Sequence, residues 1–140
     1  MKLEQIALVQ ASFGKVEPIA DVVADLFYAR LFALDPALIT LFPANMTDQK
    51  HKLMSMLKLA VTSLNRLDEL VPAVQALGQR HGTYGVTGDQ YETVGAALLW
   101  SLEQGLGFDF TPEVKAAWTA VYSLLANTMK QAQQPMVATA

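Results

Sequence analysis

The chain has 140 residues, of which 52% are hydrophobic and 16% charged, and its formal net charge is -3. Such a length predicts one domain with a substantial core, while the scarcity of basic runs argues against nucleic-acid binding. The sequence contains no Cys, which excludes disulfides and thioether attachment of a cofactor. It has neither a basic leader nor an apolar run of about 20 residues, so we expect a cytoplasmic protein that does not enter a membrane.

Apolar residues recur every three or four positions along almost the whole chain, without strand-like alternation, which predicts an all-α protein. Pro18 fits the first turn of the second helix, Asp35-Pro36 ends that helix, and a short third helix is expected to end near Leu41-Phe42-Pro43. The apolar stripe of the first helix is Leu3, Ile6, Val9 and Phe13, and that of the second is Ile19, Val22, Val23, Leu26 and Phe27.

Four longer helices are predicted in the rest of the chain. The fourth starts near Asn45 with Asp48 in its first turn, and the fifth ends at a corner rich in glycine just after His81. The sixth begins with a capping box, Thr87-x-x-Gln90, and a hydrophobic staple between Val86 and Tyr91. Gly105 and Gly107 end it, and Thr111-Pro112-Glu113 starts the seventh. We therefore expect one domain over residues 1–133 and a flexible tail over 134–140.

His81 stands in the last turn of the predicted fifth helix. A neutral imidazole there could bind a haem iron as its one protein ligand and leave the opposite coordination position open to a diatomic gas. Leu77, four residues earlier on the same helix face, would lie under the porphyrin, and a backbone carbonyl would accept the imidazole N–H. A lone histidine near a helix C-terminus is more often a partner of the helix dipole, so this residue alone leaves both interpretations open.

Two polar side chains are candidates for the opposite side of such an iron. Tyr28 carries a hydroxyl on an otherwise apolar stretch, and that hydroxyl needs a partner if it points inward. Gln49 could donate a second hydrogen bond from the first turn of the fourth helix. The ordinary alternatives are a core tyrosine bonded to a carbonyl and a surface glutamine. His51 lies about 200° from Gln49 around the helix, so we expect it in solvent rather than on the iron.

Several separately spaced motifs agree with one family. They are Phe27-Tyr28, Pro36 with Leu41-Phe42, Gln49 with Lys52-Leu53-Met54, Arg80-His81 with Tyr84-Gly85-Val86, Tyr91-x-x-Val94-Gly95-x-x-Leu98-Leu99, and Ala117-Trp118-x-x-x-Tyr122. Over roughly residues 3 to 130 the chain resembles the globins, in particular the single-domain bacterial globins related to flavohaemoglobins and to vertebrate neuroglobin. The resemblance implies a three-over-three helical sandwich around haem b, which is iron protoporphyrin IX.

The resemblance also implies roles for individual residues by matching position. His81 would be the proximal ligand of the iron, Tyr28 and Gln49 the distal polar pair, Phe42 the wedge against the porphyrin, and Leu53 the distal apolar wall.

Other matched positions would surround the cofactor. Lys52 and Arg80 would pair with the haem propionates, an exposed interaction worth about 0 to 1 kcal/mol. The remaining positions expected to contact the cofactor are Leu77, Val86, Tyr91 and Val94.

Two positions limit the likeness. Gln49 stands where vertebrate neuroglobin has a histidine, so we expect no closure of the iron by a distal histidine. Tyr91 matches a flavohaemoglobin tyrosine near the axial histidine, but the glutamate that completes that network falls near Gln133. A neutral amide cannot make the imidazole as anionic as a carboxylate can, which argues against strong oxygen activation.

The first functional hypothesis is reversible binding of dioxygen, with nitric oxide and carbon monoxide as further ligands, by a monomer or weak homodimer. The alternative is a nitric oxide dioxygenase that converts nitric oxide and dioxygen to nitrate. That activity would need an external reductase, since the chain has no Gly-x-Gly-x-x-Gly segment for a flavin or nicotinamide. Pseudo-peroxidase chemistry comes third, and whether the protein is an enzyme stays open. A cofactor-free helical sensor or scaffold is a remote alternative, and zero Cys counts against a bilin carrier.

Overall fold

The computed structural model describes residues 2–83 and 88–133, with the backbone alone at 81–83, 88 and 133. Within these residues there are helices but no strands, and the all-α prediction is confirmed. The α-helices are α1 (Leu3–Val16), α2 (Ala20–Leu34), α3 (Thr47–Thr62), α4 (Leu67–Thr83), α5 (Gly88–Leu106) and α6 (Pro112–Gln133). The short 3₁₀-helices are η1 (Glu17–Ile19), η2 (Pro36–Leu41) and η3 (Gly107–Asp109).

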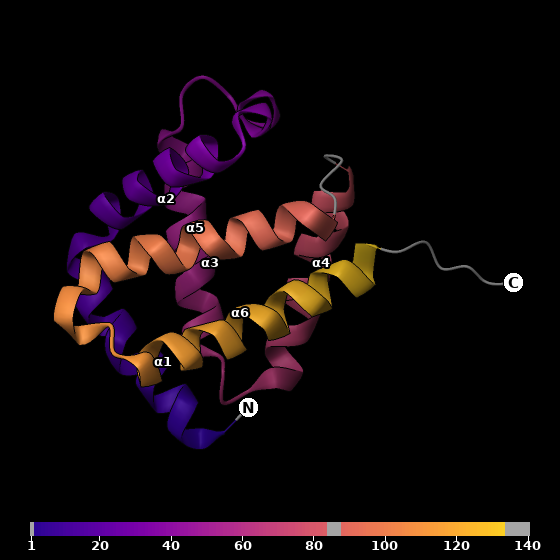
Figure 1. The fold of residues 1–140 in the computed structure, drawn as a ribbon. Helices are drawn as coiled ribbons and strands as arrows, with labels where there is room; N and C mark the ends of the chain where they lie inside the picture. The colour runs from indigo at the N-terminus through magenta and orange to yellow at the C-terminus, as the bar shows by residue number, and fades with distance from the viewer. Residues whose placement is uncertain (1, 84–87, 134–140) are drawn as a thin grey trace, which may run out of the picture.

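The six α-helices form two layers, with α1, α3 and α4 in one and α2, α5 and α6 in the other. In Figure 1, α5 and α6 cross in front of α3 and α4. Across the layers α6 packs against α1 and α4, and α2 packs against α3, while α2 and α5 pair within one layer. This is the three-over-three sandwich that the resemblance to the globins implied. None of the described helices combines the length and apolar character that crossing a membrane requires.

Three local predictions need correction. The short third helix is the 3₁₀-helix η2, started by Pro36 and by a hydrogen bond from the Ala37 N–H to the Asp35 carboxylate at 3.2 Å. Pro18 belongs to η1, so α2 begins only at Ala20. Val22 was placed in the apolar stripe of α2 but is 54% exposed. Its neighbour Val23 is buried instead, and one residue turns the helix by about 100°.

Other helix ends agree with their predicted signals. Asn45 accepts a hydrogen bond from the Thr47 N–H at 3.0 Å at the start of α3, and Thr111 accepts one from the Val114 N–H at 3.2 Å at the start of α6. Gly107 has a φ of 57° directly after α5, a conformation that glycine adopts without steric cost. The capping box and staple predicted at residues 86–91 involve Val86 and Thr87, which lie outside the described residues.

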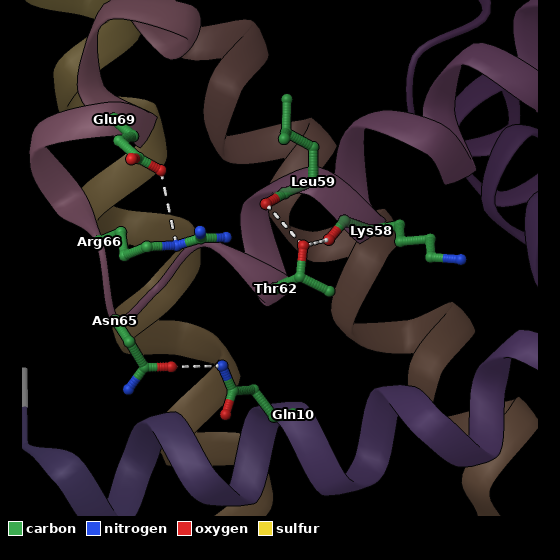
Figure 2. Close-up of polar contacts among 7 residues, drawn as sticks. All are labelled: Gln10, Lys58, Leu59, Thr62, Asn65, Arg66 and Glu69. Atoms are coloured by element: carbon green, nitrogen blue, oxygen red, sulfur yellow. Dashed lines mark hydrogen bonds and ion pairs between the residues drawn. The ribbon is translucent and has the colours of Figure 1, made fainter.

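The corner between α3 and α4 is held by side-chain hydrogen bonds, shown in Figure 2. The Gln10 amide of α1 donates to the Asn65 side chain at 2.8 Å, as Figure 2 shows. The same amide also donates to the Val61 carbonyl at 3.0 Å. Arg66, directly before α4, and Glu69, in the first turn of α4, form an ion pair of 3.5 Å. Gln10 therefore ties α1 to the end of α3 and to the segment that leads into α4.

Candidate functional site

A cavity of about 760 Å³ opens between α2, α3, α4 and α5, within the roughly 300–1,000 Å³ usual for ligand pockets. Its walls are largely aromatic and aliphatic, and exposed cationic side chains stand at its mouth. Eight of the side chains proposed from the sequence line it: Tyr28, Phe42, Gln49, Lys52, Leu53, Leu77, Arg80 and Val94. Residues separated by up to 66 positions are thus brought around one space.

The polar feature of the wall is a bonded pair from two helices. Tyr28 of α2 is only 5% exposed, and the Gln49 side-chain amide of α3 donates to its phenol oxygen at 3.3 Å. Burial raises the pKa of Tyr28, and the bond from Gln49 offsets part of that rise. The phenol therefore stays protonated at neutral pH. Because its oxygen accepts from Gln49, its own proton can be donated to an acceptor in the cavity.

Aromatic contacts fix the orientation of the Tyr28 ring. Phe27 meets it edge-on with ring centroids 4.9 Å apart, and Phe42 meets it edge-on at 5.6 Å. Phe32 lies 6.0 Å from Tyr28 and 5.5 Å from Phe42. Edge-to-face geometry of this kind is the favoured one for aromatic rings. Phe42, which follows η2, is thereby held against α2 and presented to the cavity.

The C-terminal part of α4 supplies another part of the wall. Leu77 and Arg80 line the cavity, and the backbone of His81 follows in the next position of the same helix. The side chain of His81 and the whole of Val86 lie outside the described residues. Their proposed roles as iron ligand and cofactor contact stay predictions.

Tyr91 is buried but is not among the residues found to line the cavity. The Tyr122 hydroxyl donates to the Tyr91 backbone carbonyl at 2.5 Å, and the Lys130 ammonium lies 5.7 Å from the centre of the Tyr91 ring. The side chain of Gln133 is not described. The predicted contact of Tyr91 with a cofactor therefore stays a prediction, and the charge found beside its ring is a cation.

Some lining residues were not predicted as such. They are Phe27, Leu31, His51, Ser55, Met56 and Leu59. Met56 and Leu59 could have been found from helical spacing, since Met56 follows Leu53 by three positions and Leu59 follows Met56 by three, so each is a surface neighbour of the one before it. His51 is exposed, as expected, but it also stands at the mouth of the cavity.

Comparison with known proteins places this fold and cavity in one family. The model of the family described as Globin matches residues 25–129. The chain is a globin. It is 27% identical over 127 residues to a flavohemoprotein of Bacillus subtilis (strain 168), covering 87% of this chain but only 31% of that protein. It is 33% identical over 116 residues to the neuroglobin of Danio rerio, covering 73% of each chain.

A solved structure gives the same answer for the fold. This globin superposes with a TM-score of 0.84 and 25% identity on an engineered carbene transferase, described as a putative nitric oxide dioxygenase from Rhodothermus marinus, over 94% of this chain and 92% of that one. Membership of the family makes this globin a haem protein that binds diatomic gases. The cavity fits such a group, because its apolar walls suit a macrocycle and its Lys52 and Arg80 suit carboxylates at the mouth.

Proposed function

We propose that this globin reversibly binds dioxygen, and also nitric oxide and carbon monoxide, with haem b held by His81. The observation that carries the proposal is the Tyr28–Gln49 pair, bonded at 3.3 Å on the wall of an otherwise apolar cavity. When bound, haem b would supply an iron with one coordination position left for a gas.

The remaining residues would hold the macrocycle. Phe42, Leu53 and Val94 offer apolar contacts, and Lys52 and Arg80 are exposed at the mouth, where cations stabilise carboxylates while these stay in water. A hydrophobic wall also keeps water from the gas site, which strengthens hydrogen bonds made there.

Tyr28 and Gln49 would act on the gas as a relay of two hydrogen bonds. The Gln49 amide donates to the phenol oxygen, which polarises the Tyr28 O–H and makes it a stronger donor. That O–H would donate to a gas that carries partial negative charge, and a charge-assisted bond of this kind is stronger than a neutral one. The consequence is slower release of dioxygen.

The test combines cofactor binding with release kinetics. Apoprotein titrated with haem b should take up one equivalent with a strong blue absorbance band, and His81→Ala should lose it. In the loaded protein, Tyr28→Phe should speed dioxygen dissociation by about five- to tenfold, since a hydrogen bond of about 1 kcal/mol or more is lost. Tyr122→Phe is the matched control, because it removes a partly buried hydroxyl that is bonded outside the cavity. Equal rates in wild type and Tyr28→Phe would refute the role of Tyr28.

A second candidate function is nitric oxide dioxygenation. It is favoured by the similarity, with a TM-score of 0.84, to a solved structure that is described as a putative nitric oxide dioxygenase. Nitric oxide and dioxygen would together give nitrate with the consumption of one electron each turnover, so an external reductase would have to supply that electron. Mixing oxygenated protein with nitric oxide and a reductase distinguishes the two. Nitrate well beyond one equivalent would establish turnover, whereas nitrate that stops at one equivalent with several reductases would favour gas binding alone.

A further inference from the structure

Two polar links join α2 to α3 side by side. Besides the bond from Gln49 to Tyr28, the Lys50 ammonium lies 2.8 Å from the Asp25 carboxylate. Asp25 and Tyr28 are three positions apart and so share a face of α2. Their partners, Gln49 and Lys50, are consecutive residues at the start of α3. The ion pair therefore holds the turn of α3 that carries the cavity amide.

That turn has little support of its own. The residue preceding α3, Met46, makes no side-chain cap, and among the described residues one side chain caps a backbone N–H of this turn, that of Asn45, which accepts from the Thr47 N–H. The first N–H groups of a helix lack partners within the helix and depend on caps or tertiary contacts. The position of Gln49 thus depends on what ties this turn to its neighbours.

Met46, directly before this turn, packs against the core, but the charged side chains of the turn border open space. A second, smaller cavity of about 240 Å³ lies beside the ion pair, lined by Asp21, Asp25, Thr47, Lys50 and His51. The side chains of the two helix starts leave this space between them, and both members of the ion pair line it. Lys50 is 33% exposed and Asp25 64%. A pair this exposed shifts an equilibrium by up to about fivefold, which suits fine positioning and not fold stability.

We infer that the Lys50–Asp25 ion pair is a positioning device that keeps the Gln49 amide bonded to Tyr28, an inference that rests on the proposed gas-binding role of these two residues. Without either charge the first turn of α3 frays and the amide spends less time on the phenol oxygen. The Tyr28 O–H then loses its polarising partner and releases dioxygen faster.

The kinetic test uses loaded protein and compares two lysines of the same helix. Lys50→Met should speed dioxygen dissociation by about two- to fivefold. Lys58→Met is the matched control. Lys58 also lies on α3 but away from Tyr28, and its substitution breaks a 3.3 Å ion pair with Glu17. It should leave the dissociation rate unchanged. The double exchange Asp25→Lys with Lys50→Asp should restore most of the wild-type rate. In a Gln49→Leu background, Lys50→Met should have no further effect.

A second readout uses the apoprotein and does not depend on gas binding. The side-chain amide NMR signal of Gln49, assigned by its loss in Gln49→Leu, should shift and broaden in Lys50→Met and stay unchanged in Lys58→Met. An unchanged amide signal in Lys50→Met would overturn the inference, as would equal effects of the two lysine substitutions. If Gln49→Leu itself leaves dioxygen dissociation unchanged, the gas-binding role of Gln49 fails, and the amide signal still decides whether Lys50 positions it.

Discussion

α4 and α6 cross so closely at Gly78 that a Cβ atom there would lie 2.5 Å from the Met129 carbonyl oxygen, whereas α2 and α3 meet beside the cavity through long side chains. The first contact is between backbones, which cannot give way without moving a helix. The second consists of the Tyr28–Gln49 bond and a half-exposed ion pair beside a small cavity. The helix that carries the proposed iron ligand is therefore fixed, and the side that carries the proposed gas contacts can adjust.

The largest expected effect comes from breaking the fixed side. Gly78→Ala should lower the free energy of unfolding of the apoprotein by about 1 to 3 kcal/mol, because the new methyl group meets the backbone of Met129 and overpacking costs that much. Urea unfolding followed by circular dichroism measures it. Gly14→Ala is the matched control, since nothing lies within 4 Å of a Cβ there. It should stabilise α1 by about 0.5 to 1 kcal/mol. A tolerated Gly78→Ala would show that α4 can move away from α6.

A smaller effect is expected on the adjustable side. Phe42→Leu removes two edge-on ring contacts, to Tyr28 at 5.6 Å and to Phe32 at 5.5 Å. Each contact is worth about 0.5 to 1.5 kcal/mol, and because Phe42 is only partly buried we expect the lower part of the summed range, about 1 to 2 kcal/mol of unfolding free energy. Dioxygen dissociation should also change, because Tyr28 loses a neighbour. Phe110→Leu, at a partly buried site outside the cavity lining, should cost stability alone. Unaltered gas kinetics in Phe42→Leu would mean that Phe42 does not orient Tyr28.

The same division separates what the sequence could predict from what it could not. Helical spacing placed Leu77 on a face that lines the cavity, because that spacing depends on the local chain alone, whereas Leu53 was placed there by the resemblance to the globins. Six residues from Pro36 to Leu41 are too few to tell a 3₁₀-helix from an α-helix by periodicity. Val22 and Val23 are both apolar, and their residue type alone could not show that only Val23 is buried.

Contacts between helices escaped prediction for a different reason. The closeness of Gly78 to Met129 and the pairing of Lys50 with Asp25 depend on how two distant helices are aligned along their lengths. Helical periodicity carries no information on that alignment. A glycine inside a helix signals a packing or functional reason but not the partner.

The smallest effect concerns a tyrosine on the close-packed side. The Tyr122 ring would lie 2.6 Å from a Cβ at Gly95, and burial, with a further contribution from Tyr91, raises the pKa of Tyr122 far above its ordinary value of 10.0. A raised folded-state pKa gives stability that is complete below pH 10 and is lost as the pH rises through the folded pKa. At pH 8, Tyr122→Phe should cost about 1 kcal/mol through the lost hydrogen bond.

Above pH 10, ionisation of Tyr122 in the unfolded chain lowers the unfolding free energy of the wild type by about 1.4 kcal/mol per pH unit. Tyr122→Phe has no such loss, so the two unfolding free energies should meet near pH 11. Tyr28→Phe should flatten the alkaline decline less than Tyr122→Phe does, because the rise in the Tyr28 pKa is opposed by its bond from Gln49. Urea unfolding at intervals from pH 8 to 11 measures both slopes. Parallel curves for wild type and Tyr122→Phe would show that the phenol ionises as easily in the folded protein as in the unfolded chain, and hence that the packing of α5 on α6 is looser than the contact at Gly95 requires.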